Sequence, residues 1–497
     1  TAPRNAWLLL KKMKRYKVFF TESQTKFQSS CQGQLTHRFW RSLLLVLLFW
    51  LAADTDPVFP ENPFPPTLPS LTLKAEDRLL VLAPHPDDET LNCGGLIQEA
   101  VSLKIPVRIV FFTYGESNQW AFLVSRKHPV LFPPEVRLMG ETRRREALKA
   151  GKVFNLPENS LIFLGYPDAG TLKIWEEHWA DQPPAAGLLS RARAVPYATA
   201  FRPGAAYKGE EILRDLEAII KEFQPTKIFV SHPLDWHPDH RSLYLFSLVS
   251  LWDLKSPAEI FPYLTHFPKW PVPPGYRPQL ALLPPGRTET DLQWCQLPLT
   301  GEQVFRKTAA LKQHRSQYRS HRGYLLSFMR TNELFGNLPP VLLREGQPPV
   351  LVLTRTAAEM EELAAKSEQG VEHSILLKEK LISLEKEHLV LTIRLSRPLA
   401  REIFATIHLF GYRADRPFSE MPKIRLKLGP VHHHVFSLGR ALPDDSVLVK
   451  RENSLFVLKI PLKLLGEPER IFTDYATETE NYFLERLAWR VIIVTKR

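Results

Sequence analysis

Short, mostly apolar runs alternate with amphipathic stretches over the first two thirds of the chain. A short apolar run is typical of a strand that is buried on both faces, so we predict strands over residues 78–84, 106–113, 160–164 and 227–230. Apolar residues at helical spacing predict helices between and after them, over 90–103, 140–155, 210–223, 241–252 and 301–318. The proline-rich residues 257–287 are predicted to form a loop. This strand–helix alternation predicts an α/β fold with a parallel sheet and crossover helices.

The pattern changes near residue 340, where short apolar strands separated by turn signals take over. We predict strands over residues 350–353, 388–395, 403–410, 423–428, 446–450, 454–460 and 488–494, and one helix-like stretch over 357–367. Many short strands of this kind predict a β-sandwich. We therefore divide the chain into a leader and linker at 1–70, an α/β domain at 71–340 and a β-sandwich domain at 341–497.

An apolar run near the N-terminus, Leu43–Ala53, follows the basic residues Arg38 and Arg41. Its 11 residues are fewer than the roughly 20 that span a bilayer. The run favours a secretory signal or a short signal-anchor, with a buried amphipathic helix as the alternative. Residues 54–69 hold six prolines and are predicted to be an extended linker. We expect a protein that is exported to the cell envelope or periplasm, or attached to the membrane through this segment, rather than a cytoplasmic one.

The net charge indicates which partners the protein can bind, and the cysteine content indicates which covalent or metal frameworks it can have. Lys and Arg (65) exceed Asp and Glu (53) by 12, which favours anionic partners. No basic block is interleaved with aromatic residues as in a nucleic-acid binder, so we interpret the excess as a solvated basic surface and expect no nucleic acid. The three cysteines form no CxxC pair, which argues against a disulfide framework and against a cysteine zinc site. The sequence carries no signal for an oligomeric state.

Two of the predicted strands run directly into clusters of histidine and aspartate. The first is followed by His85–Asp88 and the fourth, after a short loop, by His237–His240. Ligands of open α/β sheets bind outside the carboxyl ends of the strands, so we expect the two clusters to meet. His85, Asp88 and His240 would then hold Zn²⁺ and leave one position open for water, as catalytic zinc sites do.

The remaining residues of the two clusters are candidates for acid–base chemistry. Zinc lowers the pKa of bound water, and Asp87, next to Asp88, is the predicted base that accepts the water proton. A cationic His237 would stabilise an oxyanion, and Asp239 would hold it in that charge state. Either cluster alone also fits a turn with an Asx cap. The presence of both favours the metal site.

The segments Ala83–Glu89 and His237–His240 together resemble the PIG-L/LmbE-like zinc-dependent N-deacetylases. Tyr114–Glu116, Arg143–Glu146 and Leu164–Gly170 support the resemblance, which covers roughly residues 77–336. It implies a Rossmann-like fold and hydrolysis of an N-acetyl group from a glucosamine-type sugar. By residue, it implies zinc on His85, Asp88 and His240, Asp87 as general base and His237 as the oxyanion-stabilising partner.

Further residues are predicted to bind the substrate: Arg143, Tyr114, Glu116 and Asp168. Tyr114 stands where the family usually has an aspartate, so the contacts at that position are expected to differ. The aromatic-rich residues 171–208 fit either a lid that stacks on sugar faces or a packed surface segment. Leu487–Val491 weakly resembles a CBM9-like carbohydrate-binding module, with an interdomain support role as the alternative.

The sequence therefore predicts a zinc-dependent deacetylase of an N-acetylglucosamine-type sugar in a glycan or glycolipid. One alternative is a cytoplasmic deacetylase of a small glucosaminyl conjugate, which would need neither an apolar leader nor a second domain. Another is a catalytically silent glycan-binding protein that has kept the fold. The complete set of ligands and base argues against the silent protein.

Overall fold

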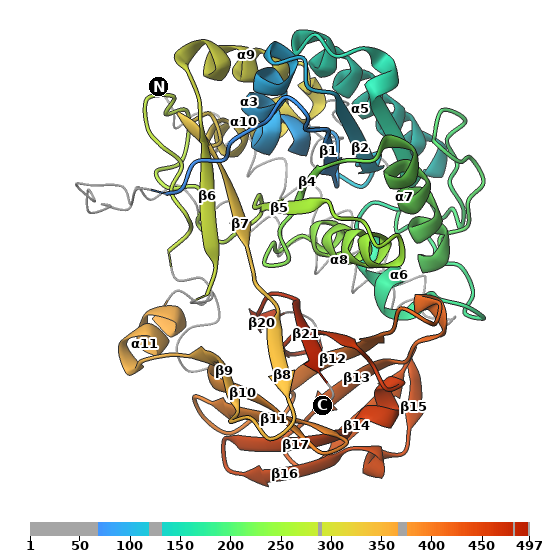
Figure 1. The fold of residues 1–497 in the computed structure, drawn as a ribbon, viewed down its shortest axis with the longest axis vertical. Helices are drawn as coiled ribbons and strands as arrows, with labels where there is room; N and C mark the ends of the chain where they lie inside the picture. Colours follow the sequence, from blue (N-terminus) through green and yellow to red (C-terminus); the bar gives the residue numbers. More distant parts are fainter. Residues whose placement is uncertain (1–67, 119–131, 287–290, 366–374, 481–482, 496–497) are drawn as a thin grey trace, which may run out of the picture. The chain divides into compact units, whose positions relative to one another are not determined.

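Five parallel strands form the sheet of the N-terminal part (Figure 1), in the order β3-β2-β1-β4-β5. They are β1 (Leu79–Ala83), β2 (Val107–Thr113), β3 (Leu161–Tyr166), β4 (Lys227–Ser231) and β5 (Glu259–Tyr263). The structure, a computed structural model, describes residues 68–118, 132–286, 291–365, 375–480 and 483–495. All residues of β1 and β4 are buried, as their apolar runs predicted. The predicted parallel sheet is confirmed.

Helices connect the strands and cover the sheet. They are α3 (Asp88–Ser102), α5 (Pro133–Val153), α6 (Thr171–Glu177), α7 (Gly209–Phe223), α8 (Pro238–Asp253), α9 (Gly301–Leu311) and α10 (Arg315–Leu326). No helix in these described ranges is long and apolar enough to cross a membrane. The predicted signal or anchor at Leu43–Ala53 and the linker up to residue 67 lie outside the described residues.

Two predictions for this part were wrong. Strand β5 lies within the predicted loop 257–287, because Pro262 interrupts the apolar run. Proline is tolerated there because β5 is an edge strand of the sheet. The predicted helix 301–318 is two helices, since the chain leaves α9 at Lys312 and restarts after His314.

The strand order places a crevice between β1 and β4. The chain runs outward from β1 through β2 to β3 and then returns to the other side of β1 to form β4. In open α/β sheets such a reversal separates the loops that follow the two neighbouring strands and opens a ligand site. Residues 84–87 leave β1 here, and residues 232–237 leave β4. This topology brings the two predicted polar clusters to one place.

An antiparallel pair, β6 (Gln293–Pro298) and β7 (Asn332–Asn337), leads into the C-terminal part. There, one sheet has the order β16-β17-β11-β10-β9, and a larger sheet has the order β15-β14-β13-β12-β18-β21-β8. In the larger sheet β19 also pairs with β12, and β20 pairs with β19. Apolar residues of both sheets, such as Leu391 and Leu426, share one buried core. The predicted β-sandwich is confirmed.

The bounds of the C-terminal strands complete the description: β8 Val341–Arg344, β9 Val350–Thr354, β10 Leu377–Glu385, β11 His388–Leu395, β12 Phe404–Tyr412, β13 Lys423–Leu428, β14 His433–Ser437, β15 Arg440–Leu442, β16 Leu448–Glu452, β17 Leu455–Pro461, β18 Arg470–Thr473, β19 Ala476–Glu478, β20 Phe483–Arg486 and β21 Arg490–Thr495. Helix α11 covers Ala357–Ala365, and single helical turns are η2 Glu158–Ser160, η3 Phe418–Glu420, η4 Asp444–Ser446 and η5 Leu462–Leu465. The charged sequence of β10 hid it from the apolar pattern.

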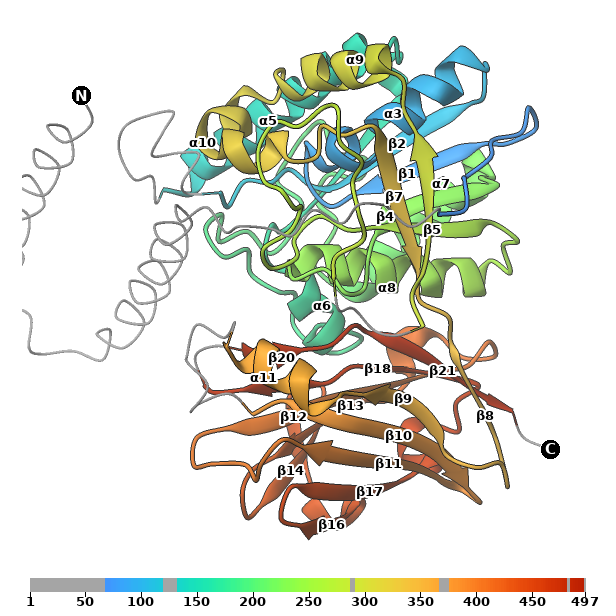
Figure 2. The ribbon, with the colours of Figure 1, turned by 90° about the vertical axis from the view of Figure 1, so that its left-hand side faces the viewer.

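The larger sheet of the sandwich packs against α6 within the compact unit of residues 64–497. Figure 2 shows this sheet between α6 and the smaller sheet of the sandwich. The indole of Trp175 on α6 lies 5.0 to 5.1 Å from the rings of Phe418 and Phe472 and 6.3 Å from Trp489, measured between ring centroids. The cores of the α/β part and of this sheet are therefore continuous.

Candidate metal centre

The turn after β1 presents two neighbouring carboxylates from a strained backbone. Asp87 is the N-cap of α3 and has φ 137° and ψ −27°, a backbone conformation that residues other than glycine rarely adopt. The backbone N–H of Asp87 donates to Glu89 Oε2 at 2.9 Å, and this bond fixes the turn between β1 and α3. Asp88 is the first residue of α3, where the helix dipole favours a negative charge.

The three predicted metal ligands lie together. Asp88 Oδ2 is 3.2 Å from His85 Nδ1 and 3.2 Å from His240 Nε2. All three side chains are buried. Two donor atoms on one tetrahedral zinc ion, with bonds of about 2.0–2.1 Å, lie about 3.3 Å apart. Each of these two pairs of donor atoms is therefore spaced as two ligands of one zinc ion would be.

His240 gives a second reason to expect an ion. Both of its ring nitrogens are buried and make no hydrogen bond, although a carboxylate oxygen lies near each. A buried polar atom without a hydrogen bond is costly unless another group satisfies it. A metal ion beside Nε2 would satisfy that atom, so the residues present fit the metal that the sequence predicts.

In both histidines, the ring nitrogen that points away from Asp88 lies beside a further carboxylate, which we call an outer carboxylate. His85 Nε2 lies 3.1 Å from Asp239 Oδ2 and 3.2 Å from Asp168 Oδ1. His240 Nδ1 lies 3.1 Å from Asp235 Oδ2. Carboxylates in this position orient a metal-binding histidine and raise its basicity. Burial lowers the pKa of His85, but its bonds to these carboxylates and to Asp88 outweigh that and raise the pKa well above the ordinary value.

Asp235 was given no role by the sequence. Its Oδ1 accepts from His237 N at 2.9 Å, and its Oδ2 accepts from Thr265 N at 3.0 Å and His266 N at 2.9 Å. Burial raises the pKa of Asp235, but His240 and the hydrogen bonds outweigh it, so the pKa falls below the ordinary value. The sequence signal that could have revealed this role is the position of Asp235 just before the His237–His240 cluster, because a carboxylate there can reach the ring of His240.

Asp87 is held by Arg143. Arg143 Nη2 donates to Asp87 Oδ1 at 3.1 Å and to Pro86 O at 2.8 Å, and Nη1 donates to Gly115 O at 2.8 Å. The pKa of Asp87 is raised to about 6. Burial is the largest cause and the charge of Asp88 adds to it, whereas the charge of Arg143 acts against it. Arg143 was predicted to bind the substrate, and the structure shows its donors on the turn that carries Asp87 and on Gly115 after β2.

His237 and Asp239 are arranged differently from the predicted pair. His237 Nδ1 accepts from the backbone N of Asp239 at 3.3 Å, whereas the Asp239 carboxylate is 3.9 Å from that nitrogen. That carboxylate instead accepts from His85, from Ala169 N at 2.6 Å and from Thr171 N at 3.1 Å. Burial and the surrounding histidines hold the pKa of His237 well below its ordinary value. Because Nδ1 accepts this bond, a proton on the His237 ring lies on Nε2.

The other residues predicted to bind the substrate are buried. Tyr114 stacks on Tyr197 with 3.8 Å between ring centroids, and its hydroxyl shares a hydrogen bond with the hydroxyl of Thr199. Burial raises the pKa of Glu116 to about 8, as does the charge of Asp168. Glu116 Oε1 accepts from Asp168 N at 3.3 Å, and Asp168 in turn faces His85. Glu116 and Asp168 thus adjoin the metal-binding cluster, whereas Tyr114 has no exposed surface.

The aromatic segment 171–208 is packed rather than open. Trp175, Trp179, Tyr197 and Tyr207 are buried in the core, whereas Phe201 is exposed. Of the two readings left by the sequence, the structure has the packed segment.

Two further histidines were missed. His266 follows β5, and its ring lies near Asp88 and His240 in a group that could also hold a metal ion. His314 Nε2 lies 2.9 Å from Glu89 Oε1, so it supports the residue that fixes the Asp87 turn. The misread β5 hid His266, and the missed break between α9 and α10 hid His314.

Comparisons with known proteins match the part of the chain that carries this site. Residues 80–249 match the PIG-L family, described as GlcNAc-PI de-N-acetylase. A 1D-myo-inositol 2-acetamido-2-deoxy-alpha-D-glucopyranoside deacetylase of Saccharopolyspora erythraea is 30% identical over 179 residues, which are 34% of this chain and 52% of that protein. The chain thus spans about half the length of this relative.

Solved structures of low identity were also found. N,N'-diacetylchitobiose deacetylase from Pyrococcus horikoshii is 17% identical, with a TM-score of 0.31 over 60% of this chain and 86% of that one. A conserved protein from Thermus thermophilus is 21% identical, with a TM-score of 0.31 over 51% of this chain and 84% of that one. The family match covers the β1 turn with His85 and Asp88 and the start of α8 with His240. Residues 80–249 of this chain are a PIG-L family domain.

Proposed function

We propose that the protein is a zinc-dependent hydrolase that removes the N-acetyl group from an N-acetylglucosamine-type sugar. The observation that carries the proposal is the position of Asp88 Oδ2, 3.2 Å from a ring nitrogen of both His85 and His240, inside the PIG-L family match. The curated relative is named as a deacetylase of an acetamido sugar, which supports the same reaction class.

The donor set favours zinc. Two imidazoles and one carboxylate are a common ligand set of catalytic zinc, in which a position stays open. Zinc bound there would polarise the amide carbonyl and lower the pKa of a water molecule in the open position. His85, Asp88 and His240 would hold the ion, and Asp168, Asp235 and Asp239 would orient the two rings.

Asp87 serves as the base in this proposal. It takes a proton from the attacking water while the water oxygen bonds to the amide carbon. When the carbon–nitrogen bond breaks, Asp87 returns that proton to the amine nitrogen, and acetate leaves. Arg143 and the Glu89 bond hold the carboxylate in place. A pKa raised to about 6 suits a group that must both accept and release a proton near neutral pH.

His237 serves as a neutral hydrogen-bond donor. Its Nδ1 accepts from a backbone N–H, which leaves the proton on Nε2 available to the oxygen of the tetrahedral intermediate. A donor that is already oriented stabilises developing negative charge without reorganisation. This role replaces the cationic His237 that the sequence predicted.

A glycan or glycolipid remains our proposal for the molecule that carries the sugar. We also propose that the protein is exported or attached to the membrane, on the basis of the Arg38 and Arg41 flank and the apolar run Leu43–Ala53. Cell fractionation tests this location. Recovery of the uncleaved chain from the soluble cytosol would instead favour the deacetylase of a small glucosaminyl conjugate.

Amine release from purified protein tests the reaction. We expect release from at least one class among N-acetylglucosamine oligomers, polymers and glycolipids, with loss on chelation and recovery on adding Zn²⁺. Asp87→Asn should lower kcat by about 10²–10⁴-fold and keep the bound metal. Bound metal without amine release from any substrate class would favour the silent glycan-binding protein. Release that is insensitive to chelator would remove the metal from the mechanism.

A further inference from the structure

Arg241 links the loop of residues 232–237, called the metal-binding loop because it leads into His240, to the β-sandwich. It directly follows His240, and its side chain is buried with 1% of its surface exposed. Its Nε donates to Pro233 O at 3.2 Å, in the loop between β4 and α8. Its Nη2 donates to Leu487 O, between β20 and β21 of the sandwich. One guanidinium thus holds two backbone segments that lie far apart in the sequence.

Apolar contacts join the same two segments. Leu234, the next residue of the loop, is buried in a cluster with Leu338 and Ala488. The consecutive residues 233–234 therefore meet the consecutive residues 487–488 through one polar and one apolar contact. Asp235, which orients His240, is the next residue of this loop.

The sandwich also packs against the element that orients the other metal-binding ring. Thr171, the first residue of α6, donates from its backbone N and its hydroxyl to Asp239, which faces His85. Four residues later, Trp175 is buried among aromatic rings of the larger sheet. The contact of α6 with the sandwich therefore lies one turn from the group that fixes Asp239.

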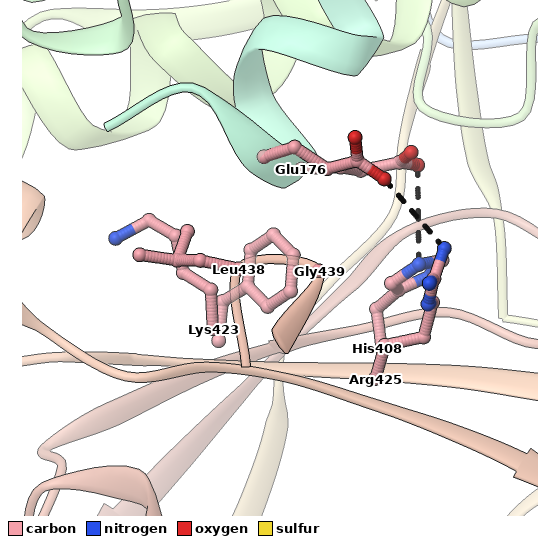
Figure 3. A pocket seen from close by; sticks show the side chains of 8 residues that line it. Glu176, His408, Lys423, Arg425, Leu438 and Gly439 are labelled. Atoms are coloured by element: carbon pink, nitrogen blue, oxygen red, sulfur yellow. Dashed lines mark ion pairs between the residues drawn. The ribbon is translucent and has the colours of Figure 1, made fainter. Parts of the chain in front are cut away.

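Charged side chains extend this contact, as Figure 3 shows at a narrow pocket between α6 and the sheet. Glu176 Oε1 lies 4.0 Å from His408 Nε2, and Glu177 pairs with Arg425. His408 Nδ1 lies 2.9 Å from Asp474 Oδ1. Burial and the charge of Arg486 lower the pKa of the Arg241 guanidinium to about 9, and the charges of Asp474 and Glu176 act against this lowering.

We propose that the β-sandwich is a structural part of the metal centre and that Arg241 is the positioning residue through which it holds the metal-binding loop. Two of the outer carboxylates that orient the rings, Asp235 and Asp239, lie on elements that the sandwich contacts. The inference rests on the metal site of the proposed function but not on its substrate. It gives the second domain a role that requires no carbohydrate binding.

Substitutions of Arg241 in the full chain test this role. Arg241→Met removes the bonds to Pro233 O and Leu487 O, and Arg241→Lys keeps the charge and restores part of them. We expect Arg241→Met to weaken Zn²⁺ binding by about 10–100-fold, as loss of support around a metal ligand does. Arg241→Lys should recover part of this loss. Competition with a chelator measures the affinity, and the visible spectrum of the Co²⁺-loaded protein reports the ligand geometry.

Arg330 is the matched control. It too is buried, and its guanidinium donates to the backbone carbonyls of Pro273, Gly275 and Arg277, away from the metal-binding residues and the sandwich. Arg330→Met and Arg330→Lys should lower the thermal midpoint as the Arg241 variants do, because each leaves carbonyls without donors. They should leave the Zn²⁺ affinity and the Co²⁺ spectrum unchanged.

The outcomes separate this inference from the proposed function. Wild-type Zn²⁺ affinity and Co²⁺ spectrum in folded Arg241→Lys and Arg241→Met would overturn the inference, as would an equal loss of affinity in the Arg330 variants. If Arg241→Met does not fold, the comparison of Arg241→Lys with Arg330→Lys decides. A wild-type protein that binds no metal would overturn both the proposed metal site and its support. A wild-type protein that binds metal and releases no amine overturns the proposed function alone.

Discussion

Asp235 Oδ2 lies 3.1 Å from His240 Nδ1, while Asp88 Oδ2 lies 3.2 Å from the Nε2 of the same ring. The two carboxylates thus face opposite nitrogens of one imidazole. In a metal-bound histidine the second ring nitrogen commonly faces such an outer carboxylate, and Asp235 lies in that position. His240 is therefore oriented before any metal binds.

Asp235→Asn tests this orientation. The amide keeps the size of the side chain and removes the charge that faces Nδ1, so the ring loses basicity. We expect Zn²⁺ affinity to fall by about 10–100-fold, measured by competition with a chelator. Asp215→Asn is the control, because Asp215 is equally buried but bonds to Tyr166 and Arg202. Equal affinities in wild type and Asp235→Asn would contradict the outer-carboxylate role.

Metal removal should destabilise the protein. His85, Asp88 and His240 converge only in the folded chain, so an ion bound there stabilises the native state over the unfolded state. The gain is about 2.7 kcal/mol when free Zn²⁺ is about 100 times its dissociation constant. We expect a chelator to lower the thermal midpoint and added Zn²⁺ to restore it. A midpoint that does not respond to chelator in a metal-loaded sample would argue against the site.

The His408–Asp474 pair should make stability depend on pH. Burial lowers the pKa of His408, but Asp474 outweighs it and raises the pKa above the ordinary 6.5. Burial raises the pKa of Asp474, but His408 outweighs it and lowers the pKa below the ordinary 3.8. The His408 contribution is fully present below 6.5 and is lost as the pH rises through its folded pKa. The Asp474 contribution is present above 3.8 and is lost as the pH falls through its folded pKa.

His408→Gln therefore should cost most stability between the two ordinary values, near pH 5. The loss there is about 3–5 kcal/mol, the usual cost of breaking a buried pair, and it should shrink at alkaline pH. Urea unfolding of wild type and variant at about pH 5 and pH 9 gives the two differences in free energy. A difference that stays constant with pH would mean that the pair carries no charge in the native state.

Gly95 is predicted to be intolerant of a side chain. It lies on α3, and a Cβ atom there would clash with the side chain of Leu299. Gly95→Ala should lower the free energy of unfolding by about 1–3 kcal/mol, the cost of overpacking a core. In α10, Gly323 faces open space, so Gly323→Ala should be neutral or stabilising because alanine favours the helix. Thermal unfolding compares the two, and a neutral Gly95→Ala would show that Leu299 can move away.

The sequence predicted what depends on strand ends and missed what depends on the packing around them. His85, Asp88 and His240 were predicted together because parallel strands end at one edge of a sheet. Asp235 and His266 were missed because their role depends on β5, whose Pro262 disguised it as a loop. Propensity and hydrophobic pattern describe one segment at a time. The role of Asp235 depends on three segments that meet in the fold: its own loop, α8 with His240, and the residues after β5.

The roles of Asp239 and Tyr114 were also beyond the sequence. Asp239 was assigned to His237, its near neighbour, but its carboxylate bonds to His85 and to the start of α6. Tyr114 follows a strand end and was predicted to meet the substrate, but it stacks on Tyr197 from a distant loop. Local spacing favours short-range partners, and burial in a folded core selects partners that are remote in the chain.

The pairing of β8 with β21 has a consequence for the order of events during synthesis. The first strand of the larger sheet, Val341–Arg344, pairs in parallel with Arg490–Thr495, the strand farthest along the chain. Its closure must therefore wait until about 150 further residues have left the ribosome, even though β1 to β5 are already available to pair. If Leu487 secures the loop through Arg241, the ion is held more weakly until that wait ends. Tight capture of the metal would then mark the chains in which β8 and β21 have paired.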